Sequence, residues 1–237
     1  MRCDAPGFRA LLRERPVGAD VTGFLLDDPM PGAGAAPGGA RWRRVLAVLA
    51  EAAVFGFLRS ADLRALVAVA RGAAVRIRVR AAEVVADRVR PDAPWPALVG
   101  ALPAAEPATG SEVTVPTALL AEAREVAAAR TDAGADWLAY ELTRRDVPAD
   151  DARAIGAFLH GADRGAELSV GLRESGAVRR APWRIEVRWG SAGRIAVVPE
   201  SPSDTYSMVA PAGPYLLGRS LQRHLDDLWQ RTGPLPR

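Results

Sequence analysis

The sequence predicts an α+β protein built around a mostly antiparallel sheet. Between residues 166 and 210, four short segments alternate apolar and polar residues and are separated by glycine-containing turns, which favours an antiparallel meander. Three helical segments precede this meander, and the first half of the chain also carries helical spacing followed by an alternating strand. A short stretch of sequence recurs as well, which indicates a pseudo-twofold protein of two helix-plus-sheet halves that share a core.

The composition is that of a globular protein. The chain has 237 residues, of which 49% are hydrophobic and 25% charged, enough for one large domain or two closely packed halves. The longest apolar stretch, residues 45–58, is interrupted by Glu51 and is too short to span a bilayer. There is one cysteine and no visible signal peptide, so we expect a soluble cytoplasmic protein without an internal disulfide.

Residues 1–40 form an N-terminal segment with mixed signals. Apolar spacing predicts a helix over residues 8–15 and a strand over residues 22–26. The tract 29–39 is rich in Gly, Pro and Ala and predicts a flexible loop. We treat the remainder, residues 41–237, as a single domain.

In the first half of that domain, helical spacing and strict alternation can both be recognised. Trp42, Val45 and Leu49 recur at helical spacing, and Ser60 is placed to cap a second helix that ends at Gly72. The expected elements are helices 42–53, 61–71 and 95–102, strands 75–80 and 83–89, and a linker at 103–110.

The second half repeats the mixture of helices and strands. Thr117 is placed to cap a long helix, and Gly161 ends the third helix of this half. The expected elements are strand 113–115, helices 117–129, 136–145 and 149–160, strands 166–173, 183–189, 194–198 and 206–210, and a final helix 214–230. The two halves of the domain are therefore expected at about residues 41–103 and 111–237.

An internal repeat at an offset of 89 residues (151 − 62) supports two related halves. Each copy is read as a helix that is closed by a glycine and followed by an alternating strand. The identical residues are Asp62, Arg64, Ala65 and Ala68 in the first copy and Asp151, Arg153, Ala154 and Ala157 in the second. Chance agreement in a chain rich in alanine and arginine is the alternative explanation.

Most residues that catalysis requires are missing. All 31 basic residues are arginine, so no Walker lysine and no Schiff-base lysine can exist. Two histidines and one cysteine make a zinc site improbable, and no G-x-S-x-G elbow occurs. We expect no catalytic residue, no metal and no cofactor; an unfamiliar site around Asp150, Asp151 and His160 is the alternative.

The strongest nucleic-acid candidate is a stripe of arginines at residues 76, 78 and 80, on one face of the expected strand. No aromatic residue interleaves the stripe, and the net charge is only +3, so we expect no nucleic-acid partner. The structural explanation is a solvated sheet face in which Glu83, Glu167 and Glu186 pair with the arginines. A regulatory or nucleic-acid-binding protein remains the alternative function.

Aromatic residues point instead to a protein partner. Trp137, Leu138 and Tyr140 lie near the start of a predicted helix, after the turn at residues 131–134. Trp and Tyr are enriched at protein interfaces, although packing in the core is the default for such side chains.

The order of motifs in the chain resembles that of the EspG family. Members of this family are chaperones of actinobacterial type VII (ESX) secretion. The strand-to-helix junction Gly110–Leu120 carries the first resemblance, and Val147–Arg153 before a helix carries the second. The strand that follows Arg180–Trp183 and the strand-to-helix element at Tyr206–Pro211 resemble the C-terminal sheet and closing element of the family.

The resemblance implies a pseudo-twofold fold with a central antiparallel sheet flanked by helical bundles. It also implies a cytosolic, non-enzymatic chaperone that binds the apolar tip of a PPE protein, without a cofactor and without a membrane. The chain is short between Arg80 and Trp95, where the family usually has further strands, so a WXG-type helical hairpin is a second possible client, and a homodimer is possible. The candidate binding residues in the C-terminal bundle are Trp137, Leu138, Tyr140, Leu142, Phe158 and Leu159.

Overall fold

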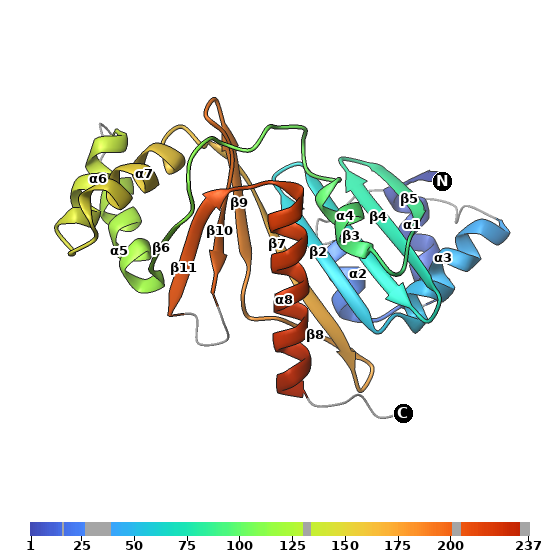
Figure 1. Cartoon of the computed structure of the whole chain (residues 1–237). Helices are drawn as coiled ribbons and strands as arrows, with labels where there is room; N and C mark the ends of the chain where they lie inside the picture. Colours follow the sequence, from blue (N-terminus) through green and yellow to red (C-terminus); the bar gives the residue numbers. More distant parts are fainter. Residues whose placement is uncertain (16, 27–38, 130–133, 201–204, 233–237) are drawn as a thin grey trace. The chain divides into compact units, whose positions relative to one another are not determined.

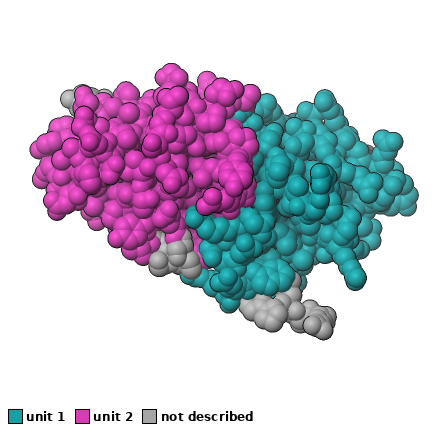
Figure 2. All heavy atoms as spheres, in the orientation of Figure 1, with its two compact units in different colours: residues 1–103, 167–182, 221–237 teal, residues 104–166, 183–220 magenta. Residues whose placement is uncertain are grey.

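The structure is a computed structural model that describes residues 1–15, 17–26, 39–129, 134–200 and 205–232. The chain divides into two compact units (Figure 2). The first contains residues 1–103, 167–182 and 221–237, and the second contains residues 104–166 and 183–220. The prediction of an N-terminal segment followed by a single domain stays a prediction.

Within the described residues, the order of elements along the chain occurs twice, as expected for a protein of two related halves (Figure 1). Each run consists of a short strand, three helices, an antiparallel meander and one closing helix. The first run is β1 (Arg2–Asp4), α1 (Ala5–Glu14), α2 (Ala19–Leu26), α3 (Ala40–Glu51), β2 (Val54–Ser60), β3 (Leu63–Ala70), β4 (Ala73–Arg80), β5 (Glu83–Val89) and α4 (Pro94–Val99).

The second run follows the same order, with one extra strand. It consists of β6 (Val113–Pro116), α5 (Thr117–Ala128), α6 (Ala135–Thr143), α7 (Ala149–Leu159), β7 (Arg164–Glu174), β8 (Ala177–Arg180), β9 (Ile185–Gly190), β10 (Gly193–Pro199), β11 (Tyr206–Pro211) and α8 (Pro214–Thr232). In the first run the meander ends with β5, which pairs with β1. In the second run it ends with β11, which pairs with β6. The first strand of each run therefore lies beside the last strand of the same run.

The register of the repeat differs from the predicted one. In the order of elements, α7 corresponds to α3, whereas the offset of 89 residues matched α7 to residues 62–72. That part of the chain is not a helix, so the identities between the two segments are chance, and the helix predicted over residues 61–71 is wrong.

Leu63–Ala70 forms strand β3 between β2 and β4 because both of its faces are covered. Helix α3 packs against β3, as does α4, and six of the eight residues of the strand are buried. A strand buried on both faces carries a nearly continuous apolar run, whose alanines here were mistaken for helix formers. Ser60, the predicted helix cap, instead accepts a hydrogen bond at its Oγ from the Leu63 N–H at 3.2 Å, within the β2–β3 turn.

The strand predicted over residues 22–26 is also wrong. These residues belong to helix α2, whose Val21, Phe24 and Leu25 are buried at helical spacing. The β-branched and aromatic residues favoured a strand locally, but tertiary packing overrides such a weak preference. The Phe24 ring makes an edge contact with Phe57 on β2 at 4.9 Å between centroids. The helix is thereby packed into the core of the first unit.

The Gly/Pro-rich tract predicted to be a loop lies almost wholly outside the described residues. The short region between Arg80 and Trp95 is a tight β4–β5 hairpin followed directly by α4. Arg80 pairs with Glu83 in the register of the hairpin, which leaves two turn residues, and Ala81 has a positive φ of 48°.

Candidate protein interaction site

Helices α5, α6 and α7 form a bundle within the second unit (Figure 1). Helices α6 and α7 approach very closely at Gly156, where a Cβ atom would lie 2.6 Å from the carbonyl oxygen of Ala135. A contact that close requires glycine, since any other residue would force the two helices apart. Gly156 therefore sets the spacing of the two helices that carry the predicted binding residues.

Three of the six predicted binding residues lie inside this bundle. Leu138, Leu142 and Phe158 are buried, with exposed fractions of 8%, 0% and 7%, and they belong to one apolar cluster. Gly110 closes over the Phe158 ring, because a Cβ on Gly110 would lie 2.7 Å from the ring. These three side chains pack the bundle, and Leu138 also lines a hollow described below. Their contact with a client stays a prediction.

The other three residues reach the surface of the bundle. The rings of Trp137 and Tyr140 lie 5.1 Å apart between centroids, and half of Tyr140 is exposed. The guanidinium of Arg144 lies 5.8 Å from the Tyr140 centroid. These residues, spaced i, i+3 and i+7 on α6, follow one face of the helix. We refer to Trp137, Tyr140 and Arg144 as the α6 ladder.

A hollow of about 240 Å³ lies in the bundle, between residues of all three helices. Leu159 lines it from α7, together with Leu138 from α6 and two alanines at the end of α5. Leu159 is partly exposed and packs against the apolar cluster of the bundle. The surface of the bundle thus combines an aromatic ladder with a small apolar depression, a combination suited to an apolar side chain of another protein.

A buried carboxylate fixes helix α6 from within. Glu141 is only 2% exposed, and its side chain forms ion pairs with Arg145 at 2.5 Å and with Arg144 at 3.5 Å. The i, i+4 and i, i+3 spacings of these pairs in the sequence could have revealed them. Because Arg144 also lies over Tyr140, the Glu141 carboxylate helps to hold the α6 ladder in place.

A second ion pair joins the bundle to the strands of its own unit. Glu186 on β9 accepts hydrogen bonds from both terminal nitrogens of Arg124 on α5, at 2.8 and 2.9 Å, and from Nε of Arg188. Burial alone would raise the pKa of Glu186, but the hydrogen bonds and charges of the two guanidinium groups outweigh burial and lower the pKa to about 2. Glu186 thus stays ionised and holds α5 against the sheet.

This pair predicts a specific pH dependence of stability. The pKa of Glu186 is lower in the folded chain, about 2, than its ordinary value of 4.5, so its stabilising effect is complete above pH 4.5 and is lost as the pH falls toward 2. Glu186→Gln is expected to unfold at lower urea concentration than the native chain at pH 7, with the difference shrinking between pH 4.5 and 2. Exposed Glu112 provides the control variant Glu112→Gln. Parallel loss of stability in the native chain and Glu186→Gln over this window would contradict the role of the pair.

The alternative sites are weaker. Asp150 is largely exposed and forms an ion pair with Arg153, and His160 is exposed. Within the described residues, no group of three or more His, Cys, Asp or Glu side chains could hold a metal ion. None of the described helices is long and apolar enough to cross a membrane.

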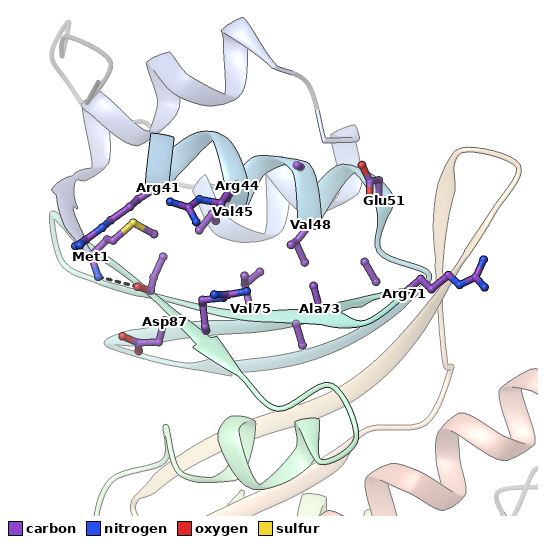
Figure 3. Close-up of a pocket in the computed structure, with 15 residues that line it drawn as sticks. Met1, Arg41, Arg44, Val45, Val48, Glu51, Arg71, Ala73, Val75 and Asp87 are labelled. Atoms are coloured by element: carbon purple, nitrogen blue, oxygen red, sulfur yellow. Dashed lines mark hydrogen bonds between the residues drawn. The ribbon is translucent and has the colours of Figure 1, made fainter. Parts of the chain in front are cut away.

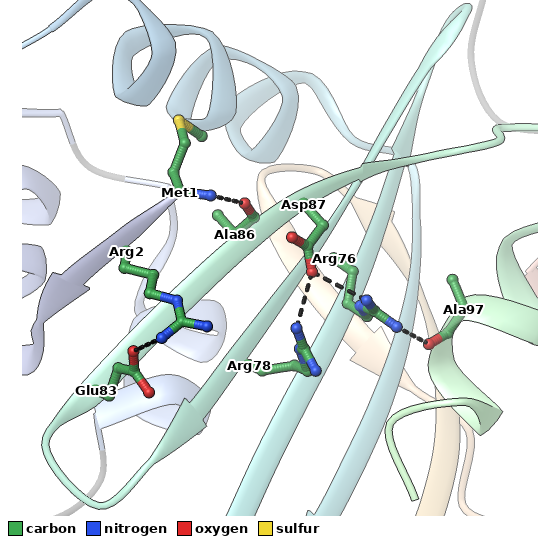
Figure 4. Close-up of polar contacts among 8 residues, drawn as sticks. All are labelled: Met1, Arg2, Arg76, Arg78, Glu83, Ala86, Asp87 and Ala97. Atoms are coloured by element: carbon green, nitrogen blue, oxygen red, sulfur yellow. Dashed lines mark hydrogen bonds and ion pairs between the residues drawn. The ribbon is translucent and has the colours of Figure 1, made fainter.

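The arginine stripe on β4 is engaged within the first unit (Figure 4). Arg76 and Arg78 both pair with Asp87 on β5, at 2.9 and 3.1 Å, and Arg80 pairs with Asp62 at 3.1 Å. Two of the predicted partners form ion pairs with other arginines, Glu83 with Arg2 and Glu186 with Arg124. The stripe is therefore a sheet face with internal ion pairs.

The chain is similar to proteins of type VII secretion. A model of the EspG family matches residues 32–223. The solved structure of the Mycobacterium tuberculosis type VII secretion system chaperone EspG5, in complex with a PE25–PPE41 dimer, matches with a TM-score of 0.69 and 18% sequence identity, over 96% of each chain. No curated protein matches the chain. The match to EspG5 shows that the two chains share a fold.

Proposed function

Since this chain belongs to the EspG family, we propose that it is a non-enzymatic chaperone of a type VII secretion system. It binds a helical substrate of the PPE type in the cytoplasm, keeps it soluble and directs it to export. The fold shared with EspG5, which has been solved as a complex with a PE25–PPE41 dimer, supports this proposal. A WXG-type helical hairpin is the second client class.

The α6 ladder is the observation that carries the assignment of the binding surface. A helical client that exposes an apolar tip needs a partner that covers this tip without burying unpaired charge. Trp, Tyr and Arg are the residues most enriched at the energetic centres of protein interfaces, and the ladder consists of one of each. Leu159 and the hollow in the bundle extend the apolar surface.

Co-expression with helical substrates encoded in the same genome tests this function. The full chain is produced with each candidate pair, and the mass of the product is measured by light scattering during size-exclusion chromatography. We expect a stoichiometric complex, and we expect the substrate to be insoluble when the chain is omitted. Light scattering of the free chain measures whether it forms a homodimer. A well-folded chain that captures none of the neighbouring helical substrates would contradict the proposal.

A further inference from the structure

The first unit contains a groove that is lined by residues 1–88 and therefore shares no residue with the α6 ladder. The proposed function does not use this groove. It has a volume of about 760 Å³ and runs between helix α3 and strands β3, β4 and β5 (Figure 3). A volume of this size is typical of sites for small molecules, which span roughly 300–1,000 Å³.

The middle of the groove is apolar and lined by small side chains. Val45 and Val48 face it from α3, and Ala73 and Val75 face it from β4 (Figure 3). Among the described residues, the remaining apolar lining consists of Met1 and several alanines. Such a surface favours an alkyl chain, because each methylene that leaves water for an apolar contact gains free energy.

The two ends of the groove differ in charge. Arg41 and Arg44 lie at the end where Met1 lies, whereas Glu51 and Arg71 lie at the opposite end (Figure 3). Arg88 also lines the groove and stands opposite Val75 in the register of β4 and β5. Arg41 and Arg44 thus make one end positive, Arg88 adds positive charge beside Val75, and the other end carries charges of both signs.

The arginines at the basic end have no carboxylate partner among the described residues. Arg44 donates only to the carbonyl of Ala40, within its own helix. Asp87 borders the groove, but its carboxylate is held by Arg76 and Arg78, on the other face of the sheet. The first turn of α3 contains no acidic residue, so the positive end of the helix dipole adds to the charge of the arginines. The described residues therefore do not neutralise the charge of the basic end.

We propose that this groove binds a single-chain fatty acid, with the carboxylate at Arg41, Arg44 and Arg88 and the alkyl chain along the valine and alanine floor. Guanidinium groups bind carboxylates through paired hydrogen bonds, which accounts for the choice of head group. The charge is also concentrated at one end, as a ligand with a single charged head requires.

Displacement of a fluorescent fatty acid tests the proposal on the full chain. The bound probe is cis-parinaric acid, and the competitors are dodecanoate, dodecanol and dodecyltrimethylammonium, which share an alkyl chain and differ in charge. We expect dodecanoate to displace the probe at about tenfold lower concentration than dodecanol, as the loss of a charge-assisted pair implies, and the cation to be weaker still.

Arg43, on the same helix as Arg44, provides the control for the arginine variants. Arg44→Gln combined with Arg88→Gln is expected to weaken dodecanoate binding about tenfold or more and to leave dodecanol binding unchanged. Arg43→Gln removes an equally exposed charge of α3 that does not line the groove and should have no effect. Val48→Glu places a carboxylate on the floor and should abolish dodecanoate binding, while circular dichroism reports that each variant is folded.

Three outcomes would overturn the proposal. The first is equal displacement by all three competitors, which would mean unspecific apolar adsorption. The second is equal loss of binding in Arg43→Gln and in the double variant. The third is a dimer, detected by light scattering, that does not bind the probe and that dodecanoate does not dissociate. In that case the occupant of the groove would be a second copy of the chain.

Discussion

Replacing Trp137 and Tyr140 together by alanine is expected to abolish capture of a helical client while the chain stays folded. The two rings contact each other on the surface of α6, and half of Tyr140 is exposed. Aromatic anchors at the centre of an interface contribute about 2 kcal/mol or more each, and such losses are not additive. We therefore expect the dissociation constant to rise by roughly 100-fold or more. Titration calorimetry with purified client measures this change.

A matched control separates the loss of a contact with the client from the general effect of removing an exposed aromatic side chain. Tyr215 on α8 is 78% exposed and lies outside the bundle, so Tyr215→Ala should leave the affinity unchanged. Phe158→Ala is not a suitable test, because its buried ring packs the bundle and its loss should cost about 3 kcal/mol of stability or more. Equal affinities of the Trp137 and Tyr140 double variant and the native chain would remove the α6 ladder from the binding surface.

Arg173→Ala is expected to produce a large loss of stability in the first unit. The Arg173 side chain donates to the carbonyl of Ala50, to that of Leu49 at 2.9 Å and to that of Val17 at 3.1 Å. Its guanidinium also lies 5.2 Å from the Phe55 centroid. Burial lowers the pKa of Arg173, but an arginine keeps its proton at neutral pH.

The reason for the large effect is the end of helix α3. The last carbonyls of a helix have no partner within it, and Arg173 satisfies two of them from a neighbouring strand. Alanine would leave these partly buried acceptors unpaired, at a cost of about 3 kcal/mol in total. The melting temperature should then fall by roughly 6–12 °C.

Differential scanning calorimetry measures this fall, and Arg179→Ala provides the control. Arg179 lies on β8 of the same hairpin but is exposed, with a longer ion pair to Glu174 at 3.6 Å. Arg173→Lys should recover only part of the stability, since a single ammonium group cannot reproduce the planar fork. A melting temperature of Arg173→Ala equal to that of Arg179→Ala would show that the carbonyls find other partners.

Local patterns predicted most of the second half, because the apolar residues of each element there recur with the period of a helix or with that of a strand. The helices α5, α6 and α7 and the meander carry amphipathic or alternating spacing that survives in the fold. In the first half, β3 is buried on both faces and its alanines match a helix equally well. Only the pairing with β2 and β4, which the spacing of apolar residues within this segment does not reveal, decides the matter.

The candidate site could be predicted only in part for the same reason. Trp137 and Tyr140 were singled out because aromatic residues are typical of interfaces, and the structure places both at the surface of the bundle. Leu138 and Leu142 lie on the same helix, but which face of α6 is buried depends on its packing against α7. The sequence shows the period of a helix and does not show which neighbour covers it.

Hydrogen exchange on the purified client complex tests the central claim most directly. The account predicts that binding slows exchange of the amides in α6 (Ala135–Thr143) and α7 (Ala149–Leu159), relative to the free chain, and leaves α3 (Ala40–Glu51) unchanged. Slowed exchange at α3 together with unchanged exchange at α6 and α7 would contradict the claim and place the client on the first unit.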